Sequence, residues 1–166
     1  MAGLFFLKGD AVNPLVKGHK IIAHICNDIG GWGKGFVLCL SKKWIKPQEA
    51  YREWFNSKQD FALGEVQFVS VSEDITIANM IAQRDIKSVG GTPPIRYRAL
   101  KKCLMKTIDF ALENSASVHM PRIGCGLAGG EWGKVESLIK QTLLKANINV
   151  FVYDLEQPRL KRSFSE

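Results

Sequence analysis

Two segments of the sequence combine a strand-like apolar run with a glycine-rich stretch, and both could bind phosphate groups. They cover residues 23–35 (AHICNDIGGWGKG) and residues 120–132 (MPRIGCGLAGGEW). Glycine permits positive φ angles and a close approach of the backbone to a ligand, so successive main-chain N–H groups can converge on phosphate oxygens. A helix that begins after such a loop adds the partial positive charge of its N-terminus. Two such loops at one edge of a sheet could clamp a diphosphate.

Neither glycine-rich segment fits a common nucleotide-binding fingerprint. The dinucleotide-binding pattern is absent, and so is the P-loop, which would end in Gly-Lys-Ser/Thr. Strand-to-helix turns use glycine routinely, so composition and spacing alone leave ordinary turns and a phosphate or nucleotide site equally open. In an open α/β sheet, a ligand would lie outside the carboxyl ends of the strands.

Several polar side chains near these segments are candidates for catalysis. His24 precedes the first loop and could act as a general base or orient a water molecule. A histidine with satisfied hydrogen bonds in a buried strand explains it equally well. Asp28 lies inside the loop and could activate water, whereas Glu131 is better explained as charge compensation at a helix N-terminus. Arg84 could pair with a terminal phosphate, or form a surface salt bridge with Asp85.

Short β-rich runs alternate with helical patterns along the chain, which is typical of α/β architecture. The expected strands cover residues 4–8, 20–26, 65–71, 75–80, 118–121 and 149–154, and the expected helices cover residues 36–44, 47–57, 94–113 and 131–145. The polar turn at 72–74 could join its flanking strands as a hairpin. In the third helix, the 3.6-residue period predicts one apolar face, made of Leu100, Cys103, Leu104, Ala111 and Leu112. We expect a mixed sheet with helices on both faces.

The length of 166 residues indicates a single domain, and 46% hydrophobic with 23% charged residues is ordinary for a globular protein with a real core. We expect that domain to cover residues 1–157 and residues 158–166 to form a flexible tail. The apolar runs are too short to cross a membrane, and the start does not resemble a secretory signal. A cytoplasmic location is therefore the default expectation.

The cysteine pattern and the net charge narrow the possible ligands. Cys26, Cys39, Cys103 and Cys125 form no C-x-x-C pair and are accompanied by no histidine cluster, so we expect no metal site and reduced, mostly buried thiols. The net charge of +7 favours anionic partners such as nucleotides, nucleic acid or acidic surfaces. The basic residues are scattered, so this charge is a weak indication of nucleic-acid binding.

Taken together, four motifs resemble the macrodomain family in their residues, order and separations. They are residues 7–10 (LKGD), 24–27 (HICN), 31–35 (GWGKG) and 121–127 (PRIGCGL), and the resemblance covers nearly the whole chain up to Asp154. The sequence looks most like the subgroup that contains ADP-ribose-1″-phosphate phosphatase and the terminal ADP-ribose glycohydrolase. This resemblance implies a three-layer α/β/α macrodomain-like sandwich with a central mixed sheet. It also implies that ADP-ribose is the ligand, without a cofactor.

The resemblance also implies roles for individual residues. Asp10 matches the acid that accepts a hydrogen bond from the adenine amino group, although a plain turn residue is an alternative. Asn27 matches a polar position near the distal ribose, and Tyr153 either borders the adenine or packs in the core. The residues that match the two diphosphate and ribose loops are Gly33, Lys34, Gly35 and Phe36 in the first loop and Gly124, Cys125, Gly126, Leu127 and Ala128 in the second.

Two departures from the glycohydrolases bear on the reaction. Those enzymes use a lysine after the middle strand and an aspartate in the second loop, where this chain has Gln83 and Ala128. Without that lysine a Schiff-base route is not available, and the acid/base partner is missing too.

Three functions are consistent with the sequence. The first is an enzyme that hydrolyses ADP-ribose-1″-phosphate or O-acetyl-ADP-ribose by metal-free attack of water, with His24, Asn27 and Asp28 as candidate polar groups. The second is a reader that binds free or protein-linked ADP-ribose without chemistry. The third, supported only by the basic charge, is a nucleic-acid-binding module.

Overall fold

The centre of the protein is a six-stranded sheet. The computed structural model describes residues 2–155; residue 1 and residues 156–166 lie outside the described residues, as does the tail predicted for 158–166. The strand order is β1-β6-β5-β2-β4-β3. The strands are β1 (Leu4–Lys8), β2 (Lys20–Asn27), β3 (Val66–Ser70), β4 (Ile75–Gln83), β5 (Ser117–Met120) and β6 (Val150–Asp154). Only β3 pairs antiparallel, with β4, so the sheet is mixed as predicted, and the hairpin at 72–74 is confirmed.

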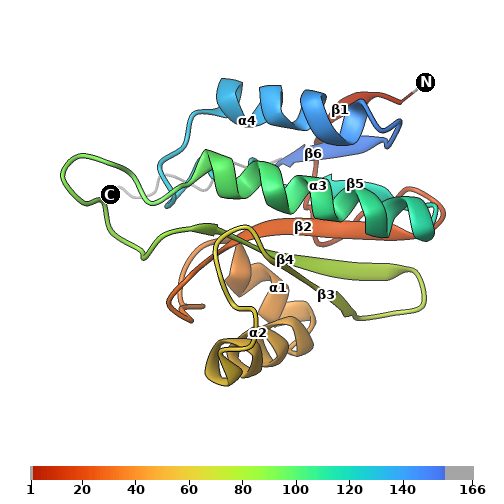
Figure 1. The fold of residues 1–166 in the computed structure, drawn as a ribbon. Helices are drawn as coiled ribbons and strands as arrows, with labels where there is room; N and C mark the ends of the chain where they lie inside the picture. The colour runs from red at the N-terminus through yellow and green to blue at the C-terminus, as the bar shows by residue number, and fades with distance from the viewer. Residues whose placement is uncertain (1, 156–166) are drawn as a thin grey trace, which may run out of the picture.

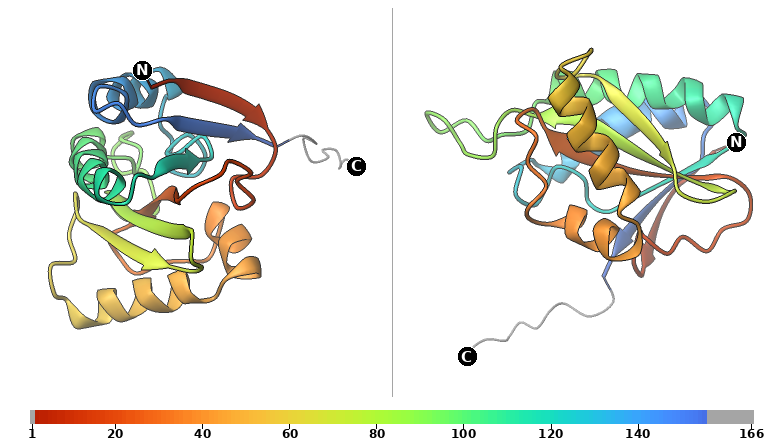
Figure 2. Two further views of the ribbon diagram at one scale, coloured as in Figure 1. Left: turned by 90° about the vertical axis from the view of Figure 1, so that its right-hand side faces the viewer. Right: turned by 90° about the horizontal axis from the view of Figure 1, so that it is seen from below.

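Helices cover both faces of this sheet (Figure 1, Figure 2). They are α1 (Phe36–Lys43) and α2 (Lys46–Ser57) on one face, and α3 (Tyr97–Glu113), α4 (Trp132–Ile139) and the π-helical turn η1 (Lys140–Leu144) on the other. Strand β2 contributes to both cores because successive side chains point to opposite faces. Ile21 and Ala23 pack in the core under α3 and α4, and Ile22 and Cys26 in the core under α1 and α2. The three-layer α/β/α architecture is confirmed.

Some element boundaries differ from the sequence prediction. Strand β4 continues to Gln83, and α3 begins at Tyr97 because the preceding residues are used in extended backbone contacts. The N–H of Arg84 donates to the Pro94 oxygen (2.8 Å) and the N–H of Ile95 to the Ala128 oxygen (3.0 Å). The helix predicted for 131–145 divides into α4 and η1.

The prediction that Leu112 shares the apolar face of this helix was wrong. Its side chain is 57% exposed, whereas Leu100, Cys103, Leu104 and Ala111 are buried. Leu112 follows Leu100 by three full turns and a further rotation of about 120°, since an α-helix advances about 100° per residue. That rotation carries it off the face that meets the sheet.

The topology brings the two glycine-rich segments to one edge of the sheet. β2 leads into loop 1 (residues 28–35) and β5 leads into loop 2 (residues 121–131). β2 and β5 are parallel neighbours, so their carboxyl ends, and the loops that follow them, lie side by side. This is the edge at which open α/β sheets bind ligands. Among residues 2–155, no helix has the length and apolar character needed to cross a bilayer.

Candidate functional site

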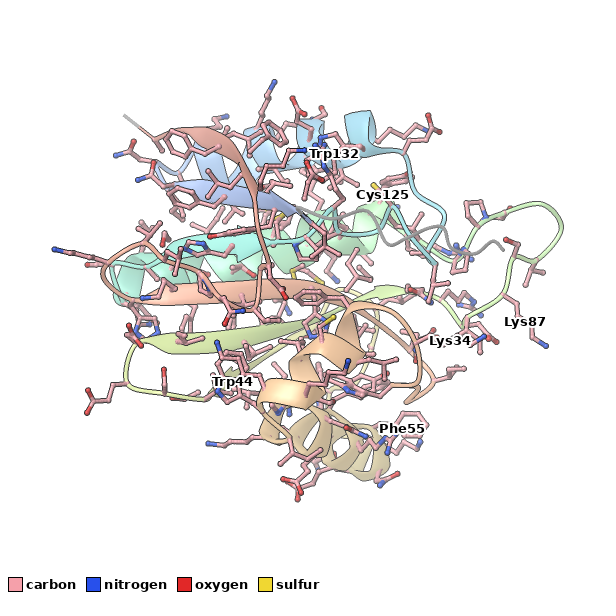
Figure 3. The ribbon with its side chains drawn as sticks, turned by 180° about the vertical axis from the view of Figure 1, so that it is seen from behind. Lys34, Trp44, Phe55, Lys87, Cys125 and Trp132 are labelled. Atoms are coloured by element: carbon pink, nitrogen blue, oxygen red, sulfur yellow. The ribbon has the colours of Figure 1, made fainter. Side chains whose placement is uncertain are left out.

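Loops 1 and 2 line a single cleft of about 540 Å³ at the carboxyl edge of the sheet. This volume is within the usual range for a small-molecule site. Loop 1 and the start of α1 contribute Gly33, Lys34, Gly35 and Phe36, and loop 2 contributes Gly124, Gly126, Leu127 and Ala128. His24 and Asn27 line the cleft from β2. Figure 3 shows Lys34 and Cys125 at the same end of the sheet, one on each loop.

Asn27 organises the backbone of loop 1. Its Oδ1 accepts the N–H groups of Ile29 and Gly31, both at 3.0 Å, and its Nδ2 donates to the Gly31 oxygen at 3.0 Å. The Tyr51 hydroxyl contacts the Asn27 main-chain oxygen (2.7 Å) and Oδ1 (2.9 Å). Burial raises the pKa of Tyr51, so the hydroxyl stays protonated and remains a donor. Asn27 therefore holds loop 1 in shape, and its second Nδ2 hydrogen has no acceptor among residues 2–155.

The end of loop 1 presents main-chain amides at the N-terminus of a helix. Gly35 is the N-cap of α1 and has φ 83° and ψ −146°, a backbone conformation that side chains disfavour. The N–H groups of Gly33, Lys34 and Gly35 donate to no acceptor within residues 2–155. The helix that begins at Phe36 adds its partial positive charge.

Loop 2 is closed by contacts between glycines. The N–H of Gly130 donates to the Gly124 oxygen at 2.6 Å, and a Cβ on Gly130 would lie only 2.6 Å from that same oxygen. A larger residue at 130 would therefore force the loop open. Within the described part of the chain, the N–H groups of Gly126, Leu127 and Ala128 have no acceptor. Both loops thus present unpaired amides at the same cleft.

The charges that line the cleft are positive. Lys34 and Arg122 are lining residues, and no aspartate or glutamate among residues 2–155 is. Arg122 donates to both Asp154 oxygens (2.9 and 2.8 Å) and packs against the rings of Phe6 and Trp132. These hydrogen bonds lower the pKa of Asp154, so the pair stays ionised. The guanidinium is therefore held by contacts with β1, β6 and α4 at the start of loop 2.

Several lining residues were not among the candidates from the sequence, and three of them are polar or lie far from the two loops along the chain: Arg122, Gln83 and Ile86. Arg122 lies inside the motif 121–127, directly after a predicted strand, and that position was the available signal. Gln83 and Ile86 also line the cleft. Gln83 was noted only as a departure from the glycohydrolases, and nothing in the local pattern pointed to Ile86.

His24 lies beneath the aromatic side chains of loop 1 and α1. It is 2% exposed, and its ring contacts Trp32 (centroids 5.5 Å apart) and Phe36 (5.8 Å). Its Nε2 lies 2.6 Å from Asn79 Oδ1, while Nδ1 is buried without a partner in residues 2–155. Burial lowers the pKa of His24 to about 4, so the imidazole is neutral at pH 7. The sequence-based alternative of a fully satisfied histidine therefore holds for one ring nitrogen only.

Four candidate residues do not line the cleft. The carboxylate of Asp28 accepts the N–H of Asp85 at 2.7 Å, and Asp28 is not among the lining residues. Asp10, at the end of β1, accepts the N–H of Val12 at 3.1 Å. Tyr153 is buried, with its hydroxyl 2.7 Å from His119 Nδ1, so core packing accounts for it. Cys125 is half-buried beside the cleft.

The remaining charged candidates, Arg84 and Glu131, are not among the residues that line the cleft. The salt bridge considered between Arg84 and Asp85 is not among the ion pairs of residues 2–155. Glu131 is the N-cap of α4 and pairs with Lys134. All four cysteines are free, and Cys39 is exposed. In the described chain, no three His, Cys, Asp or Glu side chains gather as metal ligands would.

No protein-family model matches this chain, but solved structures resemble it closely. A protein of unknown function from Bacteroides thetaiotaomicron is 55% identical, with a TM-score of 0.91 over 93% of this chain and 99% of that one. A macrodomain protein from Streptomyces coelicolor is 49% identical, with a TM-score of 0.83 over 92% and 99% of the two chains. This chain belongs to the macrodomain family.

More distant relatives of this macrodomain carry functional names. The ADP-ribose 1″-phosphate phosphatase of Candida albicans is 23% identical over 89% of this chain and 97% of its own length. The mouse chromodomain-helicase-DNA-binding protein 1-like is 28% identical over 95% of this chain, which spans only 18% of that relative's length. Thermosipho africanus DarTG, solved in complex with ADP-ribose, is 19% identical, with a TM-score of 0.68 over 82% of this chain and 38% of that one. At this low identity, the similarity supports the shared fold only.

Proposed function

We propose that this macrodomain binds ADP-ribose in the cleft between loops 1 and 2. The observation that carries this proposal is the pair of facing glycine loops: among residues 2–155, their amides are unpaired and the cleft is lined by two cations and by no carboxylate. Such donors suit the two linked phosphates of a nucleotide sugar. The names of the Candida phosphatase and of the DarTG complex support the same ligand.

The fold suggests an orientation for the bound ligand. Asp10, the residue that matches the adenine-binding acid, follows β1, and Arg122 follows β5, with β6 between these strands. The adenine would therefore lie toward the β1 edge of the sheet. The distal ribose would then lie toward His24, Asn27 and Gln83, which line the cleft from β2 and β4.

We further propose that the substrate is an ester at the distal ribose, such as ADP-ribose-1″-phosphate or O-acetyl-ADP-ribose. His24 is neutral and can accept a proton, whereas the carboxylate of Asp28 is engaged with Asp85. We therefore assign the general base to His24. Gln83 and Ala128 line the cleft in place of the lysine and aspartate of the glycohydrolases, which disfavours Schiff-base chemistry at those positions.

A non-catalytic reader is the second candidate function, and one observation favours it. His24 Nδ1 is closed off from solvent, so the base cannot reach water without a movement of loop 1. A reader needs the amides of both loops but needs no base.

Calorimetric titration with ADP-ribose, followed by product analysis, separates these functions. We expect saturable binding and release of phosphate from ADP-ribose-1″-phosphate or of acetate from O-acetyl-ADP-ribose. Binding without turnover of either ester would leave the reader function. Absence of heat and of a thermal shift with ADP-ribose would refute both.

A further inference from the structure

Three polar side chains form a hydrogen-bonded row across the sheet, away from the open part of the cleft. His24 on β2, Asn79 on β4 and Gln67 on β3 are register partners, so they stand side by side on one face. His24 Nε2 lies 2.6 Å from Asn79 Oδ1, and Asn79 Nδ2 donates to Gln67 Oε1 at 3.1 Å. Asn79 is fully buried, and the side chains of Asn79 and Gln67 lie against main-chain oxygens of α2.

Main-chain oxygens of α2 determine the direction of this row. The Ala50 oxygen can only accept, so Gln67 turns its Nε2 toward it (2.9 Å) and presents Oε1 to Asn79. The Pro47 oxygen lies 3.3 Å from Asn79 Nδ2, and it too can only accept. Asn79 must therefore point Nδ2 at these two acceptors and Oδ1 at His24.

The orientation of Asn79 decides which nitrogen of His24 carries the proton. Because Oδ1 can only accept, Nε2 of the neutral imidazole must be the N–H donor. Nδ1 is then the nitrogen with the free lone pair. It is also the one buried side-chain N or O atom without a partner in residues 2–155.

We propose that Asn79 is a positioning residue that holds His24 in the Nε2–H tautomer and so reserves the Nδ1 lone pair for a ligand hydroxyl or water. The catalytic use of this lone pair rests on the proposed function, whereas the assignment of the tautomer rests on the hydrogen bonds alone. Buried acceptors are nearly always paired in native proteins, so an orphan beside a ligand cleft points to a partner that arrives with the ligand. Trp32 and Phe36 contact the His24 ring and line the cleft, so a shift of these side chains when the ligand binds would uncover Nδ1.

Nitrogen NMR of the imidazole tests the tautomer directly. At pH 7 we expect His24 Nε2 protonated and Nδ1 unprotonated, and we expect the Nδ1 resonance to move when ADP-ribose saturates the cleft. In Asn79→Leu the acceptor is lost, so the single tautomer should give way to a mixture. Thr76→Val is the matched control, because Thr76 is equally buried on β4 but pairs with His19 outside the cleft. A protonated Nδ1 in the wild type, or no response of Nδ1 to ADP-ribose, would overturn the proposal.

Kinetics with whichever ester is hydrolysed distinguish a role of Asn79 in positioning His24 from a role in stabilising the fold. Asn79→Leu should lower kcat by about tenfold or more, with KM and the Kd for ADP-ribose changed by less than about twofold. Gln67→Met, which removes only the second link of the row, should act in the same direction and covers the case in which Asn79→Leu fails to fold. Equal losses in kcat and binding would show a structural role and sink the proposal. If no ester is hydrolysed while the wild-type tautomer is as assigned, the hydrolytic function fails and the positioning role of Asn79 stands.

Discussion

Gly35 and Leu127 face each other across the cleft: a Cβ atom on Gly35 would lie 3.4 Å from Leu127 Cδ1. One residue follows β2 and the other follows β5, so this contact exists only because those two strands are neighbours. Any side chain at position 35 would therefore meet Leu127 on loop 2. The absence of a side chain at 35 therefore serves both the backbone turn and the width of the cleft.

Gly35→Ala should destabilise the protein by about 1–3 kcal/mol, because the backbone there has φ 83° and an alanine would be strained. Gly33→Ala is the matched control, since a Cβ at 33 meets nothing within 4 Å and its φ is not positive. Urea denaturation should show a change of about 0.5 kcal/mol or less for the control. A loss in Gly35→Ala as small as that of the control would mean that loop 1 tolerates a side chain at 35.

Gly126→Glu should fold normally and lose ADP-ribose binding. A Cβ at 126 points into open space and φ is not positive, so the fold can accept it. The added carboxylate would occupy and repel the diphosphate position. Gly133→Glu has the same charge and the same free space but lies on α4, outside the cleft. Calorimetry should find wild-type affinity in Gly133→Glu, and undiminished affinity in Gly126→Glu would show that the phosphates lie elsewhere.

Asp10→Ala should weaken ADP-ribose binding by roughly 1–3 kcal/mol, the usual cost of losing a charged hydrogen-bond partner. The loss should disappear with a ligand whose base is hypoxanthine, because that base lacks the amino donor. Asp10 also accepts the Val12 N–H, so its loss could destabilise the fold. The melting temperatures of the wild type and of Asp10→Ala should therefore be measured together with the titrations. A variant that still prefers adenine to hypoxanthine would remove Asp10 from the adenine site.

Arg122→Lys should lower ADP-ribose affinity by about tenfold although the charge is kept. Lysine cannot make the two-point contact with Asp154 and so cannot hold a cation in the same place. Asp154→Asn should weaken binding less, since the guanidinium still packs against Phe6 and Trp132. Full affinity in Arg122→Lys would indicate that Arg122 merely ties the strand ends together.

Stability should fall as the pH drops from about 6.5 toward 4. Burial lowers the pKa of His24 and of His119 to about 4, against an ordinary value of 6.5. In that window the unfolded chain takes up protons that the folded protein does not bind, so each histidine costs about 2 kcal/mol between pH 7 and pH 5. At neutral pH both histidines are neutral in the folded protein, so their full contribution to the free energy of unfolding is present there. His119→Gln should therefore flatten the pH dependence of the free energy of unfolding over this range, and an unaltered slope would contradict it.

Much of the local structure could be predicted from the sequence. Strand β1 matches its expected bounds, and α2 begins within one residue of Pro47 as expected, because a short apolar run and a proline at a helix start act over a few residues. The glycine positions also identified both loops. The prediction failed at Leu112, which the turn of the helix carries off the face that holds Leu100 and Leu104.

Only the tertiary structure decided which of these elements meet. The amino-acid sequence determined the α/β alternation, the two glycine loops and His24 as a candidate, because each depends on residues adjacent along the chain. The pairing of β2 with β5 on one side and β4 on the other decided that the loops share a cleft and that His24 stands opposite Asn79. Strand order and register arise from packing between distant segments, and a slip of one residue would turn Asn79 to the other face.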